Sequence, residues 1–218
     1  MEYVEFKQTT KKNKLYHIGK YSFSKLEIKH LIVAFFLILM TIFVSQFGLK
    51  KVIMSFLTLE FWIIFGIYFL TIGLGFIFHE LGHKLVAQHY GFVSEFRADF
   101  SMLFIMLAIS VFSRFILLAP GAVMIWGRPT IKQNGIISIA GPLINLILAI
   151  IFVIIQIIIG PTLITSIGLS VNAFLGIFNM LPFWVLDGKK VLNWSTKYYL
   201  LVMIPLVLIF VLNILGYF

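Results

Sequence analysis

The chain has 218 residues, of which 61% are hydrophobic and only 11% are charged. A soluble domain of this length cannot bury so much apolar surface, because its exterior has to carry charge. Lipid must therefore be the solvent for much of the chain. Lys and Arg number 17 against 8 Asp and Glu, and we expect this positive charge to set membrane orientation and to contact anionic lipids rather than nucleic acid. Cysteine is absent, which excludes disulfide bonds and a thiolate metal site.

The first 30 residues are polar and basic and include seven lysines. We interpret residues 1–30 as a tail, either solvated or in contact with lipid head groups, and residues 31–218 as a single membrane-embedded domain. The first apolar run begins late and has no small-residue cleavage site, so we predict a retained span rather than a signal peptide. Five segments approach the roughly 20 residues that a helix needs to cross the hydrocarbon layer: Leu31–Phe47, Phe61–Phe78, Ile136–Ile159, Leu163–Leu181 and Tyr198–Phe218. The predicted fold is an all-α, multi-pass membrane protein.

The second of these segments runs into His79-Glu80-Leu-Gly-His83, an H-E-x-x-H motif. Positions i and i+4 lie on one helix face, so both histidines can bind one metal ion, and Glu80 can reach a water bound to it. Two imidazoles, one further ligand and an open position are the catalytic arrangement for zinc. Ionisable groups at the edge of an uncharged span mark function. The alternative is a chance match at the wet end of a helix.

Residues 101–119 form one more apolar run, but it contains three serines and an arginine and is followed by Pro120-Gly121. It either spans the membrane or enters it and returns. Beyond it, Ala122–Ile125 and Pro129–Ile131 are short and β-prone. This pattern predicts a small strand-containing loop, with an irregular loop as the alternative.

Two polar residues in the second half of the chain are candidate functional residues. In lipid, the side-chain amide of Asn145 needs a hydrogen-bond partner. We expect it to bond to a neighbouring helix, and the alternative is that it supports a metal ligand. Pro182 interrupts a helix, so Asp187 should lie on irregular or restarted backbone. No other acidic residue follows Asp99, and Asp187 is therefore the obvious third ligand for the two histidines. The alternative is a turn aspartate before a glycine.

The distribution of Lys and Arg favours five spans over six. With five, seven basic residues in the tail, five between Lys84 and Lys132 and three after residue 184 share one side, which makes fifteen inside against two outside. With six, Arg114 lies within the membrane and is left out, the split is nine to seven, and His83 and Asp187 lie on opposite sides. Because Lys and Arg concentrate in the cytosol, we predict that residues 101–119 are re-entrant or interfacial. The N-terminus and the metal site then face the cytosol.

Three motifs in register resemble the site-2 protease family of intramembrane zinc metalloproteases. They are the H-E-x-x-H motif at the end of a span, Gly141-Pro142 opening a later span, and Asn179-x-x-Pro182-x-x-x-x-Asp187-Gly188 after the next. The likeness covers about residues 60–190. It implies one zinc ion per chain, held by His79, His83 and Asp187, with Glu80 as general base and Asn179 holding the substrate backbone. It also implies that the strand loop lies beside the active site.

The sequence departs from the family at Trp184, where a second proline is common, and at Lys189, where a second glycine is common. The expected activity is hydrolysis of peptide bonds within or near transmembrane segments of membrane proteins. A prenyl-protein-processing type of zinc protease would need a later Glu as third ligand, and no Glu follows Glu95. A non-catalytic binding or transport protein that retains the fold is the other alternative. Substrate, regulation and oligomeric state are not indicated.

Overall fold

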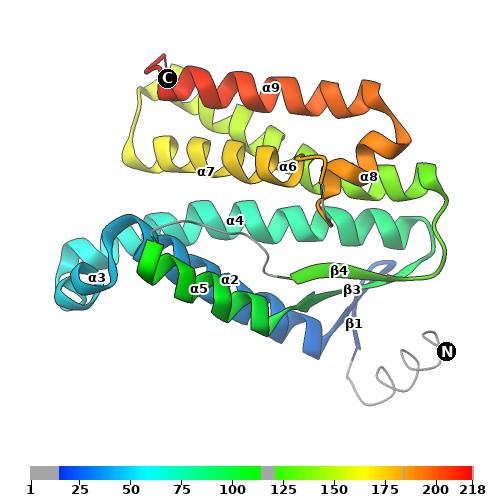
Figure 1. Cartoon of the computed structure of the whole chain (residues 1–218), viewed down its shortest axis with the longest axis horizontal. Helices are drawn as coiled ribbons and strands as arrows, with labels where there is room; N and C mark the ends of the chain where they lie inside the picture. The colour runs from blue at the N-terminus through cyan, green and yellow to red at the C-terminus, as the bar shows by residue number, and fades with distance from the viewer. Residues whose placement is uncertain (1–14, 114–120, 184, 218) are drawn as a thin grey trace. The chain divides into compact units, whose positions relative to one another are not determined.

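The structure is a computed structural model that describes residues 15–113, 121–183 and 185–217. Most of these residues are helical, which confirms the predicted all-α, multi-pass membrane fold (Figure 1). The elements in chain order are β1 (Leu15–Ile18), β2 (Tyr21–Ser24), α2 (Lys25–Phe47), α3 (Leu49–Ser55), α4 (Leu59–His89), β3 (Val93–Ala98), α5 (Phe100–Ser113), β4 (Gly121–Trp126), α6 (Ile131–Ile159), α7 (Leu163–Asn179), α8 (Asp187–Trp194) and α9 (Thr196–Ile214).

The chain divides into two compact units. The first lies within residues 1–66 and 87–127, and the second comprises residues 67–86 and 128–218. Helix α4 therefore contributes its central part to the second unit and its two ends to the first.

In the first unit, the predicted N-terminal tail contains regular structure from Leu15 onward. Strands β1 and β2 form an antiparallel hairpin, and Ser24 caps α2 by accepting a hydrogen bond from the Glu27 backbone at 3.0 Å. The side-chain amide of Gln88 pairs with both backbone groups of Ser22, at 2.9 and 3.0 Å. The first helix thus begins six residues before the predicted apolar run. Residues 1–14 of the tail lie outside the described residues.

A second strand pair, β3 with β4, is antiparallel in the register Val93↔Trp126 to Ala98↔Gly121. The expected strand at Ala122–Ile125 is present as β4, but the expectation for Pro129–Ile131 was wrong. There, Thr130 caps α6 in a capping box with Gln133, so the polar side chains favour a helix start over a strand. The position of this strand pair relative to the metal site stays a prediction.

Four helices within the described residues are long and apolar enough to cross a membrane: α2, α4, α6 and α9. The fifth predicted span corresponds to α7, which has 17 residues and rises about 26 Å, slightly less than the roughly 30 Å of a hydrocarbon core. Helix α5, with 14 residues, rises only about 21 Å and is too short to cross alone. Residues 114–119 of the ambiguous segment lie outside the described residues, so its re-entrant course stays a prediction.

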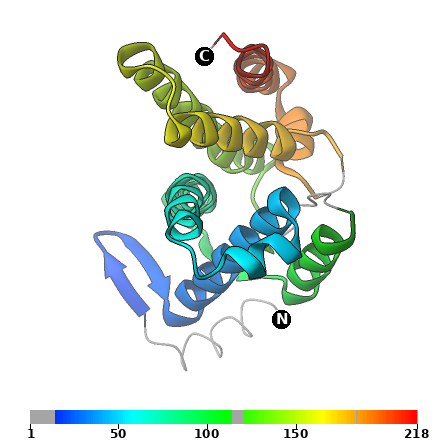
Figure 2. The same ribbon diagram turned by 90° about the vertical axis from the view of Figure 1, so that its left-hand side faces the viewer.

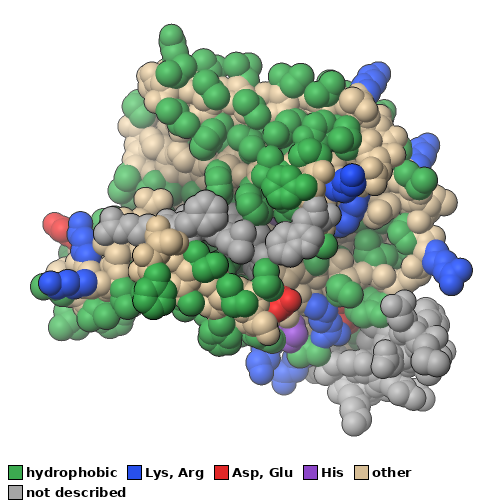
Figure 3. Space-filling model, in the orientation of Figure 1, with side chains coloured by type: hydrophobic (Ala, Val, Ile, Leu, Met, Phe, Trp, Pro, Cys, Tyr) green, Lys and Arg blue, Asp and Glu red, His purple; other side chains and the backbone are tan. Residues whose placement is uncertain are grey.

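In the second unit, helices α6, α7 and α9 pack against one another and α8 packs on α6 and α9 (Figures 1 and 2). One apolar core joins α6, the turn after α7, α8 and α9 through Leu146, Met180, Val191, Val202 and Leu206. A smaller core of Ala149, Leu169 and Ala173 joins α6 to α7. Hydrophobic side chains dominate the visible outer face of α7 and α9, while Lys and Arg lie toward the end where α8 meets α9 (Figure 3). This distribution suits an apolar band in lipid with a charged rim at one end.

Candidate metal centre

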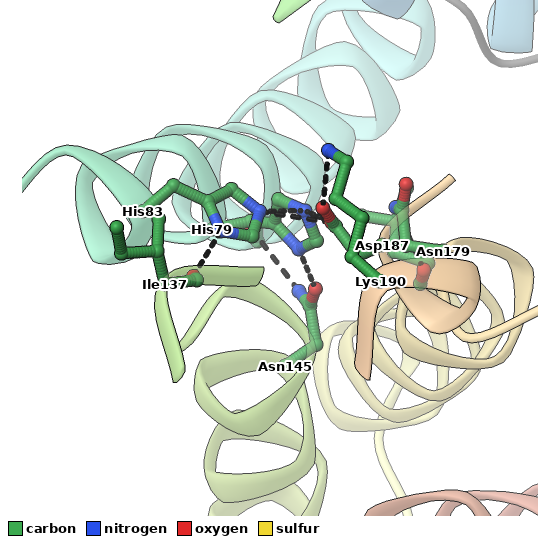
Figure 4. Close-up of polar contacts among 9 residues, drawn as sticks. His79, His83, Ile137, Asn145, Asn179, Asp187 and Lys190 are labelled. Carbon is green, nitrogen blue, oxygen red and sulfur yellow. Dashed lines mark hydrogen bonds and ion pairs between the residues drawn. The ribbon is translucent and has the colours of Figure 1, made fainter. Parts of the chain in front are cut away.

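Three potential metal ligands converge inside the second unit. His79 Nε2 lies 3.0 Å from His83 Nε2, and Asp187 Oδ2 lies 3.5 Å from the first nitrogen and 3.0 Å from the second (Figure 4). Three ligands of one tetrahedral zinc ion at about 2.1 Å stand roughly 3.4 Å apart, so this triangle has the size that the ion requires. All three residues are at least 91% buried. The donor set of two imidazoles and one carboxylate matches catalytic zinc sites that keep one position open.

Helix α4 presents the two histidines together because it continues without a break from Leu59 to His89. Residues four apart differ by only about 40° around a helix axis, so the two rings point to the same side. The carboxylate reaches them by another route. Helix α7 ends at Asn179, the chain turns, and a new helix begins at Asp187, as expected from Pro182.

The turn before Asp187 requires a glycine at position 188. A Cβ atom on Gly188 would lie 2.0 Å from the carbonyl oxygen of Met180, so any side chain would push α8 away from the end of α7. Lys190, one turn further along α8, places its Nζ 3.6 Å from Asp187 Oδ1. Burial by itself raises the pKa of Asp187, but the neighbouring imidazoles and Lys190 outweigh it and hold this pKa well below its ordinary value. Asp187 is therefore a carboxylate with Oδ2 facing the histidines and Oδ1 facing Lys190.

The far sides of both imidazoles are held by helix α6. His83 Nδ1 donates to the backbone oxygen of Ile137 at 2.8 Å, and His79 Nδ1 lies 2.6 Å from Asn145 Oδ1. A ring whose Nδ1 carries the proton keeps the Nε2 lone pair free for a metal, and such outer contacts also fix the ring orientation. Asn145 was expected mainly to join helices. It does so by donating to Gly75 O at 3.1 Å, and it also supports His79.

Helix α6 passes so close to the donor atoms that only glycine fits at position 141. A Cβ there would lie 2.4 Å from His83 Nε2 and 2.7 Å from His79 Nε2. The space beside the two nitrogens is therefore open only because residue 141 has no side chain. The buried donors, their fixed tautomers and this space together fit a zinc ion.

The two remaining predicted site residues lie next to this centre. Glu80 is 8% exposed and interacts electrostatically with His79, Asp187 and Lys190. Asn179, at the end of α7, donates its side-chain amide to Leu175 O at 3.0 Å and lies on the Asp187 side of the centre (Figure 4). Their catalytic and substrate-binding roles stay predictions.

Sequence reasoning missed Asn172, a fully buried amide on α7 that contacts Asn145. A signal was present, because Asn172 lies seven residues before Asn179 and so on nearly the same face of an otherwise apolar helix.

Comparison with known proteins finds peptidases. The sequence profile described as "Peptidase family M50" matches residues 67–170. This range contains the H-E-x-x-H motif, Gly141 and Asn145, but it ends before Asn179 and Asp187. A protein of Methanocaldococcus jannaschii named "Putative zinc metalloprotease MJ0611" is 41% identical over 150 residues, which cover 66% of this chain and 78% of the relative. No solved structure gives a significant match.

The buried donor set, two of whose three members lie on a helix long and apolar enough to cross a membrane, together with these matches, defines a membrane metallopeptidase. The chain belongs to peptidase family M50, the site-2 protease family, which confirms the resemblance inferred from the motifs.

Proposed function

We propose that this protein is an intramembrane zinc endopeptidase that hydrolyses peptide bonds within or near the transmembrane segments of other membrane proteins. The observation that carries the proposal is the convergence of His79, His83 and Asp187 at one buried point, with two of them on a helix able to cross a membrane. A buried cluster of ionisable groups at membrane depth is costly and is kept for function.

The chemistry divides between the ion and the chain. His79, His83 and Asp187 would hold one zinc ion, which supplies Lewis-acid activation of water and of a peptide carbonyl. Glu80, adjacent to His79 on α4, takes the proton of the attacking water on a carboxylate oxygen and delivers it to the nitrogen of the leaving amine. The low exposure of the four side chains keeps bulk water away and strengthens these electrostatic interactions.

Asn179 is proposed to hold the substrate backbone. Its position at the end of α7, on the side of Asp187 and Lys190 (Figure 4), leaves it close to the centre without being a ligand. A substrate helix must unwind before its carbonyl can be attacked, because its backbone groups are hydrogen-bonded to one another. An amide side chain near the ion offers the unwound backbone both a donor and an acceptor.

The direct test uses purified protein in liposomes with a model single-span substrate. Wild type should contain about one zinc per chain and cleave the substrate. Glu80→Gln should retain the zinc and lose cleavage by about 10²- to 10⁴-fold, the usual contribution of general acid–base catalysis. Full cleavage by Glu80→Gln would remove Glu80 from its role. Zinc binding without cleavage by the wild type would favour the non-catalytic alternative.

We also propose that the N-terminus and the metal centre face the cytosol. The support is the fifteen-to-two distribution of basic residues under five spans and the positive-inside rule. The native chain has no cysteine, so single-cysteine variants give labelling without background. Arg128→Cys and Lys189→Cys should react with an impermeant maleimide from the cytosolic side, and Lys50→Cys from the opposite side. Labelling of position 128 from the outside would refute the five-span topology.

A further inference from the structure

We propose that Asn172 is a positioning residue of the metal centre, which acts through Asn145 to hold His79 in the tautomer and orientation that bind zinc. This inference rests on the proposed zinc function. It concerns a residue that touches neither the ion nor a ligand.

A continuous chain of side-chain contacts links α7 to the centre. Asn172 Nδ2 donates to Gly168 O at 2.8 Å, and Asn172 Oδ1 accepts from Asn145 Nδ2 at 3.2 Å. Asn145 Nδ2 also donates to Gly75 O at 3.1 Å, while Asn145 Oδ1 lies 2.6 Å from His79 Nδ1. Three helices, α4, α6 and α7, therefore meet in one chain of hydrogen bonds.

The directions of these hydrogen bonds follow from backbone groups that can only accept. Because Gly168 O is an acceptor, the amide nitrogen of Asn172 must face it, and the oxygen of Asn172 faces Asn145. The nitrogen of Asn145 then has two acceptors, Asn172 Oδ1 and Gly75 O, one for each of its protons. The oxygen of Asn145 is left for His79, so His79 Nδ1 must carry the proton and Nε2 keeps the lone pair for the metal.

Without the Asn172 oxygen, the preference for this orientation of the Asn145 amide weakens. If the Asn145 amide turned over, its NH₂ group would face His79 Nδ1, which would then have to accept. The ring proton would move to Nε2, where a metal needs the lone pair. Asn172 thus favours the orientation of Asn145 that is compatible with zinc.

The packing leaves the two amides little freedom. Asn145 and Asn172 are both fully buried, and a Cβ on Gly75 would lie 2.7 Å from Asn172 Oδ1. Helix α4 approaches this amide closely only because residue 75 is glycine. A buried amide in an apolar membrane helix carries a desolvation cost, which the contact to Asn145 offsets.

The test measures zinc affinity and ligand geometry rather than cleavage. Asn172→Leu should raise the zinc dissociation constant about three- to tenfold, since one neutral hydrogen bond behind an outer contact is lost. It should also shift the visible d–d bands of the cobalt-substituted protein, which report the ligand field. Asn213→Leu is the matched control, because Asn213 Nδ2 donates to Ser170 of the same helix at 2.9 Å without reaching the centre. It should change neither quantity.

A double-mutant cycle separates positioning from general destabilisation. Asn145→Leu alone should weaken zinc binding about 10- to 100-fold, and adding Asn172→Leu should then change the affinity by less than about twofold. Equal effects of Asn172→Leu in the presence and absence of Asn145 would overturn the proposal, as would unchanged affinity and spectra in the single variant. If the leucine variant does not fold, Asn172→Ala takes its place with the same expected outcomes. Failure of the proposed peptidase function would appear separately, as wild-type protein that binds zinc without cleaving.

Discussion

Replacing Gly141 by alanine tests the metal centre with one added methyl group. The new Cβ would stand 2.4 Å from His83 Nε2 and 2.7 Å from His79 Nε2, whereas non-bonded carbon atoms prefer separations of about 3.5–4.0 Å. At least one ring must move by roughly 1 Å. Ligand distances in metal sites tolerate only about 0.2 Å, so a displacement of this size breaks the donor triangle.

The rings cannot swing away without further loss. Each imidazole is held at its opposite edge, His83 by Ile137 O at 2.8 Å and His79 by Asn145 at 2.6 Å. Turning either ring would break a buried hydrogen bond and leave a polar group unpaired, at a cost of about 1–3 kcal/mol. We therefore expect Gly141→Ala to weaken zinc binding by at least about 100-fold and to abolish cleavage at ordinary zinc concentrations.

The assay compares zinc affinity, by competition with a chromogenic chelator, with thermal unfolding of the zinc-free protein. Gly141→Ala should lose affinity while the zinc-free melting temperature falls only slightly, since alanine favours a helix over glycine by up to about 1 kcal/mol, which offsets part of the roughly 1–3 kcal/mol lost with the hydrogen bond. Gly66→Ala is the control on α4, because a Cβ there meets nothing within 4 Å. Its zinc affinity should equal that of wild type. Wild-type zinc affinity in Gly141→Ala would refute the reasoning that α6 shapes the metal site.

Two further substitutions test a close backbone contact and the hydrogen bonding of a buried polar side chain. Gly188→Ala should lower the zinc-free melting temperature more than Gly141→Ala does, because its Cβ would stand 2.0 Å from a backbone oxygen that cannot rotate away. A zinc-free melting curve like that of Gly141→Ala would contradict this. Gln156→Leu removes one hydrogen bond to Ser166 at 3.2 Å together with a buried Oε1 that has no partner among the described residues. These two effects should offset each other, so the free energy of unfolding should change by less than about 1 kcal/mol in chemical unfolding. A loss above about 2 kcal/mol would show that Gln156 Oε1 has a hydrogen-bond partner in the membrane.

Helical periodicity made the main elements and two of the three ligands predictable. The spacing of His79 and His83 implies a common helix face, and α4 is a single helix through both. Long apolar runs indicated the membrane helices but not their ends. Helix α6 begins at Ile131, five residues before the predicted span, because Thr130 and Gln133 cap it. Strand β3 was missed because Val93–Ala98 contains a serine, a glutamate and an arginine, and its strand character comes from pairing with β4.

The sequence by itself determined the solvent of this protein and the chemistry of its site. Apolar content requires lipid, and two histidines at helical spacing with a lone distant aspartate provide a zinc donor set without cysteine. Only the tertiary structure decided which groups hydrogen-bond the far side of the two histidine rings. The contacts from α6 to His79 and His83 join residues up to 66 positions apart, and no local pattern encodes such distances. They arise because helices packed in lipid approach most closely at glycine and satisfy their buried amides on one another.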